Sequence, residues 1–158
     1  MTEKCPNKVR LKYLLKDLVD IYSPSGKEGE ISEYISAYLN DLGLPVTLRE
    51  VTEGRRNIEL VFSSKPTQLA FLGHIDTVSA FDIEDYKFHQ EKDEIYGLGT
   101  ADMKGGCAAL IEAFICAHDT GIDLEKCALF LVVGEEETGD GTAQLLKARS
   151  FPWAVVAE

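Results

Sequence analysis

The sequence predicts an α/β domain built as a three-layer sandwich, with a mainly parallel central sheet between layers of helices. Two observations lead to this prediction. Segments with apolar residues at helical spacing alternate along the chain with short apolar segments of strand length. The strand segments are almost continuously apolar, which is typical of strands buried on both faces of a parallel sheet. Such sheets bind ligands beyond the carboxyl ends of their strands, so the residues that follow each strand are the first candidates for function.

The first part of the chain contains two predicted helices followed by two predicted strands, at residues 9–23, 30–43, 45–51 and 57–62. The first helix has an apolar stripe at helical spacing and is ended by Pro24 and Gly26. Ser25 is the candidate N-cap of the second helix, which stops at Gly43. The second strand shows partial alternation of apolar and polar residues.

The rest of the chain reads as strand, hairpin, helix, strand, helix and strand, at residues 68–78, 86–99, 103–121, 126–133, 141–149 and 153–158. The strands at 68–78 and 126–133 have almost no polar residue before their ends, which indicates burial in a sheet. The helix at 103–121 is rich in alanine and closes at Gly121. Residues 153–158 read as a last buried strand without a turn, cap or polar tail, so we expect the chain to be part of a longer protein.

Composition excludes several classes of function. The 158 residues suit one globular domain, and the formal net charge of −11, without a basic stripe, argues against nucleic acid as a partner. No apolar run is long enough to span a membrane, and the N-terminal residues lack a secretory signal, so a cytoplasmic location is expected. The cysteines show no metal-binding or disulfide spacing and are expected to be reduced thiols: Cys5, Cys107, Cys116 and Cys127.

Polar residues follow three of the predicted strands, at the point where each strand ends. His74 and Asp76 follow one strand, three consecutive glutamates follow the next, and Glu158 follows the last. Parallel strands bring their carboxyl ends to the same edge of a sheet. The sequence therefore predicts that histidine and carboxylate side chains, which are common metal ligands, gather at this edge.

The glutamate run Glu135–Glu137 directly follows the most apolar strand of the chain. Adjacent carboxylates repel one another beside a buried segment unless a cation lies close to them. One carboxylate could then bind the cation while its neighbour accepts a proton from bound water. A solvated acidic loop is the alternative and is common for charge runs, but it does not explain the position after a buried strand.

His74 and Asp76 are spaced so that, in an extended chain, both side chains leave on the same side. Asp76 could then hold one ring nitrogen while the other binds a metal, although a core histidine followed by a turn explains the pair equally well. Asp102 precedes a helix, where an N-cap is the simpler interpretation, and its flanking glycines would let it approach two cations. A phosphate-binding loop is weakly supported, because no glycine precedes Lys104 and no Ser or Thr follows it.

With these residues assembled, the chain resembles a family of dinuclear zinc hydrolases. The family includes aminoacylase, acetylornithine deacetylase, succinyl-diaminopimelate desuccinylase and the glutamate-releasing carboxypeptidase G. The matching stretches, in the order of the family, are "GHIDTV", "YGLGTADMKGG", "GEEETGDG" and "VVAE", and "SPSG" near the N-terminus also fits. The resemblance implies that residues 1–158 are the N-terminal part of a zinc-exopeptidase-like catalytic domain, with the lid domain and the C-terminal part absent from this chain.

Carried over residue by residue, the resemblance makes His74 a terminal ligand of one metal and Asp76 the partner that orients it. Asp102 would bridge two metals, and Glu158 would complete the ligands of the first. A cis peptide bond is expected between Asp102 and Met103, because members of the family often have a non-proline cis bond at this point.

The family's acidic-Glu-Glu-x-Gly run aligns with the glutamates so that Glu136 is the general base and Glu137 a ligand of the second metal. Glu135 replaces the aspartate that is common in the family. The histidine that the family uses for the second metal has no match, because His89 and His118 are interpreted as surface residues.

The resemblance implies a metal-dependent hydrolase that cleaves the amide bond of N-acyl amino acids, with acetylornithine deacetylase or desuccinylase activity as the first expectation. Its cofactors would be two divalent ions, zinc with cobalt or manganese as alternatives. A dipeptidase or glutamate-releasing carboxypeptidase of the same family, a non-catalytic metal-binding domain and a nucleotide-binding module are the alternatives. The expected partners are a small N-acyl amino acid or a short peptide, with a homodimer formed through the lid domain. These 158 residues alone are expected to have little or no activity.

Overall fold

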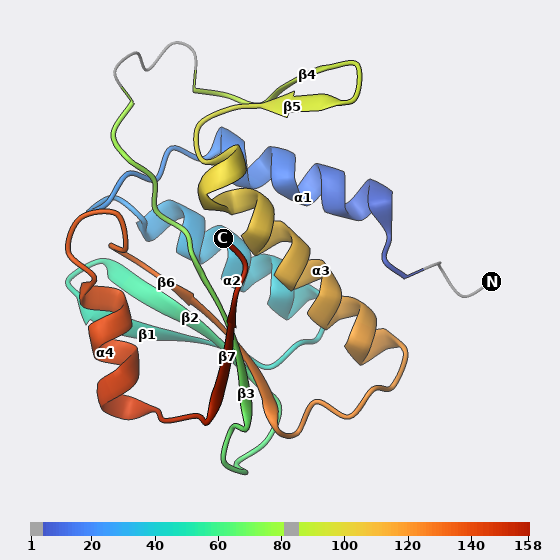
Figure 1. The fold of residues 1–158 in the computed structure, drawn as a ribbon, viewed down its shortest axis with the longest axis vertical. Helices are drawn as coiled ribbons and strands as arrows, with labels where there is room; N and C mark the ends of the chain where they lie inside the picture. Colours follow the sequence, from blue (N-terminus) through green and yellow to red (C-terminus); the bar gives the residue numbers. More distant parts are fainter. Residues whose placement is uncertain (1–4, 81–85) are drawn as a thin grey trace.

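A computed structural model describes residues 5–80 and 86–158 of the chain (Figure 1). Its helices are α1 (Lys8–Asp20), α2 (Gly29–Asp41), α3 (Gly105–Asp119) and α4 (Asp140–Ala148). Its main sheet contains β1 (Val46–Thr52), β2 (Arg55–Val61), β3 (Leu69–His74), β6 (Cys127–Val132) and β7 (Trp153–Val156). A separate hairpin is formed by β4 (His89–Glu91) and β5 (Glu94–Tyr96). All of the predicted helices and strands, and the hairpin, are therefore present.

The main sheet is mainly parallel, as predicted. Its strand order is β1-β2-β6-β3-β7. The strands β6, β3 and β7 pair in parallel, and β2 runs antiparallel to both β1 and β6. All strands except β2 therefore point the same way. The register pairs His74 with Val132, so β3 and β6 end side by side.

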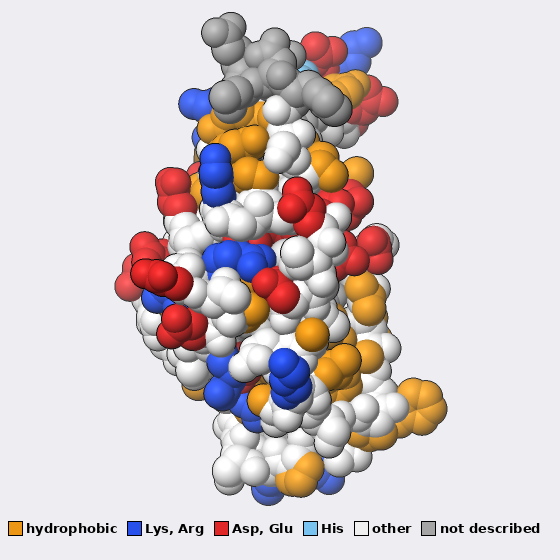
Figure 2. Space-filling view, turned by 90° about the vertical axis from the view of Figure 1, so that its left-hand side faces the viewer, with side chains coloured by type: hydrophobic (Ala, Val, Ile, Leu, Met, Phe, Trp, Pro, Cys, Tyr) orange, Lys and Arg blue, Asp and Glu red, His pale blue; other side chains and the backbone are white. Residues whose placement is uncertain are grey.

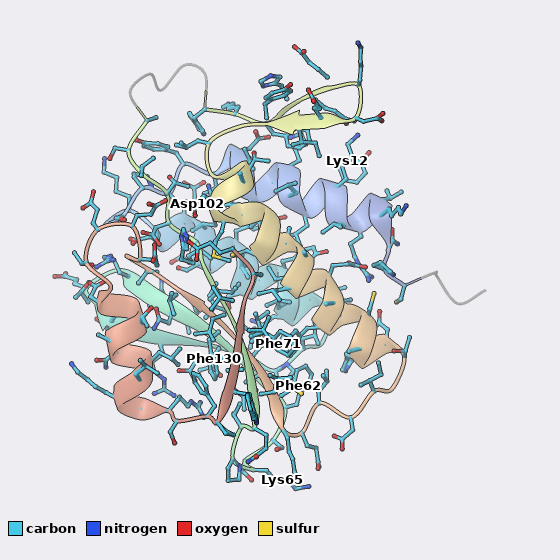
Figure 3. The ribbon with its side chains drawn as sticks, in the orientation of Figure 1. Lys12, Phe62, Lys65, Phe71, Asp102 and Phe130 are labelled. Carbon is cyan, nitrogen blue, oxygen red and sulfur yellow. The ribbon has the colours of Figure 1, made fainter. Side chains whose placement is uncertain are left out.

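The sheet lies between two unequal helix layers. The helices α1, α2 and α3 pack on one face around the larger apolar core, while α4 packs on the other face. The strand β6 supplies both cores because its side chains alternate: Leu129 and Leu131 face the larger core, and Phe130 and Val132 face α4. Figure 3 shows Phe71 and Phe130 pointing to opposite sides of the central strands. The three-layer prediction is confirmed.

The prediction of a buried strand at 153–158 is wrong. The strand β7 exists, but its side chains are exposed, with 72% of Trp153 and 57% of Val156 open to solvent. The reason is its position at the edge of the sheet, where it pairs with β3 on one side only. Among the described elements, no helix packs on β7 with more than marginal contact.

The predicted N-cap of the second helix is also wrong. The helix α2 begins at Gly29, one residue earlier than the predicted range, with Glu28 at the N-cap position and no side chain capping it. The hydroxyl of Ser25 instead donates a hydrogen bond to Asp76, which lies just after the end of β3.

None of the helices in the described ranges is long and apolar enough to cross a membrane.

The helix predicted at 103–121 begins two residues later than expected. Asp102 and Met103 have non-helical backbone angles, and the peptide bond between them is cis, as the resemblance predicted. The backbone N–H of Lys104 donates to the carbonyl of Gly99, so residues 99–104 form a compact turn that leads into α3. This turn directs the side chain of Asp102 away from the helix and toward the end of β3.

Candidate metal centre

Three segments that are far apart in the sequence meet beside the carboxyl ends of β3 and β6. His74 ends β3, Asp102 lies in the turn before α3, and Glu136 lies in the loop after β6. The Nε2 atom of His74 is 3.0 Å from Oδ1 of Asp102. Each of these three residues offers one ligand atom, and the three atoms lie within 4.8 Å of one another. Figure 3 shows Asp102 at the end of the sheet toward which β3 and β7 run.

The donor atoms in this cluster fit a divalent metal ion. An imidazole nitrogen and carboxylate oxygens are ligands that zinc, cobalt and manganese accept in proteins. The side chain of His74 is 2% exposed, whereas that of Asp102 is 59% exposed, so the cluster opens to solvent on the Asp102 side. Among the described residues, this is the only group of three or more potential ligands with such spacing.

The ring of His74 is oriented by Asp76. Its Nδ1 atom lies 3.0 Å from the backbone oxygen of Asp76 and 3.5 Å from the carboxylate oxygen Oδ1. A carbonyl oxygen only accepts hydrogen bonds, so Nδ1 carries a proton and Nε2 is the nitrogen that faces Asp102. The nearest partner of Nδ1 is thus the backbone oxygen of Asp76, and the carboxylate of Asp76 lies just beyond it.

The protonation of His74 depends on the same neighbours. Burial alone lowers the pKa of His74, but the contacts with Asp76 and Asp102 outweigh it and raise the pKa to about 9. At neutral pH the ring therefore carries a second proton, which a bound cation would displace.

The carboxylate of Asp76 also holds the loop that carries the glutamates. It is fully buried and accepts hydrogen bonds from the backbone N–H groups of Glu135 and Glu136, each at 3.1 Å. Burial raises the pKa of Asp76. The contacts with His74 and Ser25 and the two backbone donors lower this pKa by more, so the net shift is downward. Asp76 therefore links the ring of His74 to the backbone of the glutamate loop.

The three glutamates are not equivalent. The side chain of Glu136 reaches the cluster, and burial together with the nearby charge of Asp102 raises its pKa. A raised pKa makes a carboxylate a better proton acceptor, which is what a general base requires. The side chain of Glu135 is 48% exposed and its Oε2 lies 3.8 Å from Nε2 of His74. Glu137 is exposed and lies outside the cluster.

The glutamate loop is also held at its far end by an ion-pair network. Arg55 binds Asp140 through Nη1 at 2.5 Å, and Oδ1 of Asp140 accepts a hydrogen bond from the hydroxyl of Thr138 at 2.8 Å. Arg55 also binds both carboxylate oxygens of the fully buried Glu28, at 2.9 and 2.8 Å. On the face of the molecule that carries this loop, acidic side chains lie on both sides of a basic group (Figure 2). No sequence pattern pointed to Arg55, because its partners are distant along the chain.

Two cavities open on either side of the cluster. One, of about 240 Å³, is lined by His74, Glu135 and Glu158 among others. The other, of about 280 Å³, is lined by Asp102 and Glu136, with apolar side chains and glycines around them. Glu158 therefore shares a cavity with His74, although it is outside the cluster of three ligands. His89 and His118 are exposed, as predicted, and neither belongs to the cluster.

A comparison with known protein families identifies the family of this chain. Residues 70–157, more than half of the chain, match the profile of the peptidase family M20/M25/M40. The chain belongs to this family. The predicted resemblance and the fold class are both confirmed.

Two curated relatives illustrate the similarity and how much of each protein the chain covers. The succinyl-diaminopimelate desuccinylase of Orientia tsutsugamushi is 32% identical over 131 residues, which cover 78% of this chain and 34% of that protein. A peptidase M20 domain-containing protein of Schizosaccharomyces pombe is 33% identical over 147 residues, covering 90% of this chain and 36% of that protein. The chain thus spans about a third of the length of the curated relatives it matches.

Solved structures show the same fold. A tripeptidase from Staphylococcus aureus superposes with a TM-score of 0.78 at 26% identity, covering 95% of this chain and 43% of that one. Human carnosine dipeptidase 1 superposes with a TM-score of 0.71 at 22% identity, covering 87% of this chain and 34% of that one. The second likeness shows the fold alone.

Proposed function

We propose that these residues are the N-terminal part of the catalytic domain of a metal-dependent amidohydrolase of the M20 family. Its first expected substrates are N-acyl amino acids, cleaved with acetylornithine deacetylase or desuccinylase specificity. The observation that carries the proposal is the cluster of His74, Asp102 and Glu136 at the carboxyl ends of β3 and β6. The desuccinylase relatives, of which the chain covers about a third, support this substrate class.

In this proposal two divalent cations are held by the chain. His74 and Glu158 would bind one of them, Glu137 the other, and Asp102 would bridge both. Bound in this way, divalent cations polarise an amide carbonyl and lower the pKa of water to about 7. The exposed position of Glu137 and the open side of Asp102 leave room for both side chains to turn toward a cation.

The chain's own residues would position and move the proton. Glu136 would accept a proton from the attacking water and deliver it to the leaving amine, because its raised pKa makes it a better proton acceptor. Asp76 would keep Glu136 in place through the backbone of the glutamate loop, and it would keep Nδ1 of His74 protonated so that Nε2 faces the cation.

A peptidase is the second candidate. The tripeptidase from Staphylococcus aureus shares the fold over 95% of this chain at 26% identity, which favours a short peptide as an alternative substrate. Both candidate functions use the same metal centre, so they differ only in the substrate that binds beside it. Homodimerisation through a lid domain stays a prediction.

The test is the Glu136→Gln variant of the complete protein, with the exposed Glu53→Gln as the matched control. Rates are measured on N-acetylornithine, N-succinyl-diaminopimelate, a dipeptide and a tripeptide, and metal content is measured by atomic absorption. We expect Glu136→Gln to lose about 10²–10⁴-fold in rate on the preferred substrate with its metal content unchanged. Hydrolysis at the wild-type rate by Glu136→Gln with full metal content would disprove the assignment of the base.

A further inference from the structure

The segment "SPSG" runs beside the residues that directly follow β3 and is hydrogen-bonded to them. The backbone N–H of Ser25 donates to the carbonyl of Thr77 at 3.1 Å, and the N–H of Thr77 donates to the carbonyl of Ser23 at 3.0 Å. Pro24 and Thr77 form a parallel bridge. This places the hydroxyl of Ser25 against Asp76, and its Oγ donates a short hydrogen bond of 2.5 Å to Oδ2 of Asp76.

The carboxylate of Asp76 has its hydrogen-bond partners entirely within the protein. Oδ2 accepts from Ser25 and from the N–H of Glu136, and Oδ1 accepts from the N–H of Glu135 and faces His74. Asp76 is 0% exposed, so in the intact chain its carboxylate depends on these protein partners. A hydrogen bond to a buried ionised group is among the stronger hydrogen bonds in proteins, and removing its donor leaves a buried acceptor unsatisfied, which is unfavourable in free energy.

Two simpler roles for Ser25 do not fit the structure. It does not cap α2, because Glu28 occupies the N-cap position and no side chain makes a capping hydrogen bond there. It is not placed as a nucleophile either, because a serine nucleophile gives its proton to an imidazole. The hydroxyl of Ser25 donates to the carboxylate of Asp76 instead, and the ring of His74 has other partners.

We propose that Ser25 is a positioning residue of the metal centre, acting through Asp76. Its hydroxyl fixes Oδ2 of Asp76, and Asp76 in turn fixes the ring of His74 and the backbone of Glu136. Ser25 therefore sets the placement of one ligand and of the base together, from a segment about fifty positions away in the chain. The inference rests on the proposed function, because it assumes that His74 binds the cation.

The experiment measures zinc affinity by isothermal titration calorimetry on the complete protein, with urea unfolding of each variant as a second readout. The variants are Ser25→Ala, Ser25→Thr and the matched control Ser23→Ala. Ser23 is buried in the same segment and donates to the carbonyl of Ile75 at 2.8 Å, so its loss loosens the same strand without touching Asp76. Ser25 is partly exposed, which leaves space for the methyl group of threonine.

We expect Ser25→Ala to weaken zinc binding about tenfold, the lower end of the range for losing an outer hydrogen-bond partner of a metal ligand. Ser25→Thr keeps the hydroxyl and should restore the affinity of the unchanged chain. Ser23→Ala should lower the free energy of unfolding while leaving zinc affinity within about twofold, since it makes no bond to Asp76. If Ser25→Ala does not fold, Ser25→Cys takes its place, because a thiol is only a weak donor.

Equal losses of zinc affinity in Ser25→Ala and Ser23→Ala would overturn the proposal, because a purely structural role predicts that result. Unchanged affinity in Ser25→Ala would overturn it as well, and so would a folded Ser25→Thr variant that binds zinc as weakly as Ser25→Ala. Failure of the unchanged chain to bind zinc is a different outcome, because it would overturn the proposed metal centre itself and this inference with it.

Discussion

Replacing Arg55 with methionine should strongly destabilise the chain, because Arg55 is the partner of a carboxylate that cannot reach water. Glu28 is 0% exposed and its two oxygens are bound by Nε and Nη2 of Arg55. Removing one member of a buried ion pair leaves an uncompensated charge, which costs about 3–5 kcal/mol. The second partner, Asp140, is 31% exposed and can return to water, so its share is at most about 1 kcal/mol.

We therefore expect Arg55→Met to lower the free energy of unfolding by about 4 kcal/mol. Domains are typically stable by about 5–15 kcal/mol, so the variant should still fold at low temperature. The assay is urea unfolding followed by circular dichroism at pH 7, with the slope against urea compared between variants to check that the unfolded states are alike.

The matched control is Arg56→Met, the same change one residue further along β2. Arg56 pairs with Glu33, whose side chain is 66% exposed, so breaking this pair should cost about 1 kcal/mol or less. A second variant, Glu28→Gln in the Arg55→Met background, should recover about 2 kcal/mol, because a buried amide costs less than a buried unpaired carboxylate. The reasoning would be refuted if Arg55→Met and Arg56→Met were equally stable, or if Glu28→Gln destabilised the Arg55→Met background further.

Three more predictions concern stability. Gly134→Ala should lower the free energy of unfolding by about 2 kcal/mol more than Gly121→Ala does. Both glycines have positive φ, but a Cβ at Gly134 would lie 2.2 Å from Oδ1 of Asp140, whereas Gly121 has open space. Urea unfolding measures the difference, and equal losses in the two variants would contradict it. The pKa of Glu59 is raised by burial but lowered more by Arg49 and Arg149, so its contribution to stability is present above the ordinary carboxyl pKa and is lost as the pH falls below it. Glu59→Gln should therefore flatten the decline in unfolding free energy below about pH 5, and an unchanged slope there would speak against it. Zinc at 100 times its dissociation constant should raise the free energy of unfolding by about 2.7 kcal/mol and therefore raise the melting temperature. EDTA should reverse this rise. An unchanged melting temperature would mean that zinc does not prefer the folded chain.

Much of the fold could be predicted from the sequence because its signals are local. The apolar periodicity of each segment is enough to tell helix from strand, and the alternation of the two kinds of segment indicates a largely parallel sheet. The position of His74 and of the glutamate run at one edge of the sheet could be predicted in the same way, since each follows a strand. Asp102 by itself reads as a helix N-cap, and only the family resemblance placed it at the site and singled out Glu136 among the glutamates.

The parts that sequence reasoning missed depend on partners that are distant along the chain. Ser25 has the residue type and position of an N-cap, and only the path of the "SPSG" segment beside β3 shows that its hydroxyl meets Asp76 instead. Apolar composition predicted burial for β7, but burial also depends on what covers a strand, and an edge strand is covered on fewer sides. The network of Arg55 has no local signal at all.

The measurement that tests the central claim most directly is a zinc titration of three histidine variants by calorimetry. His74→Ala removes the imidazole of the cluster, whereas His89→Ala and His118→Ala remove exposed imidazoles that the structure places elsewhere. We predict saturable zinc binding by the unchanged chain, by His89→Ala and by His118→Ala, and its loss in His74→Ala alone. Zinc binding by His74→Ala with the affinity of the unchanged chain would contradict the claim that the ends of β3 and β6 and the turn before α3 form a metal centre.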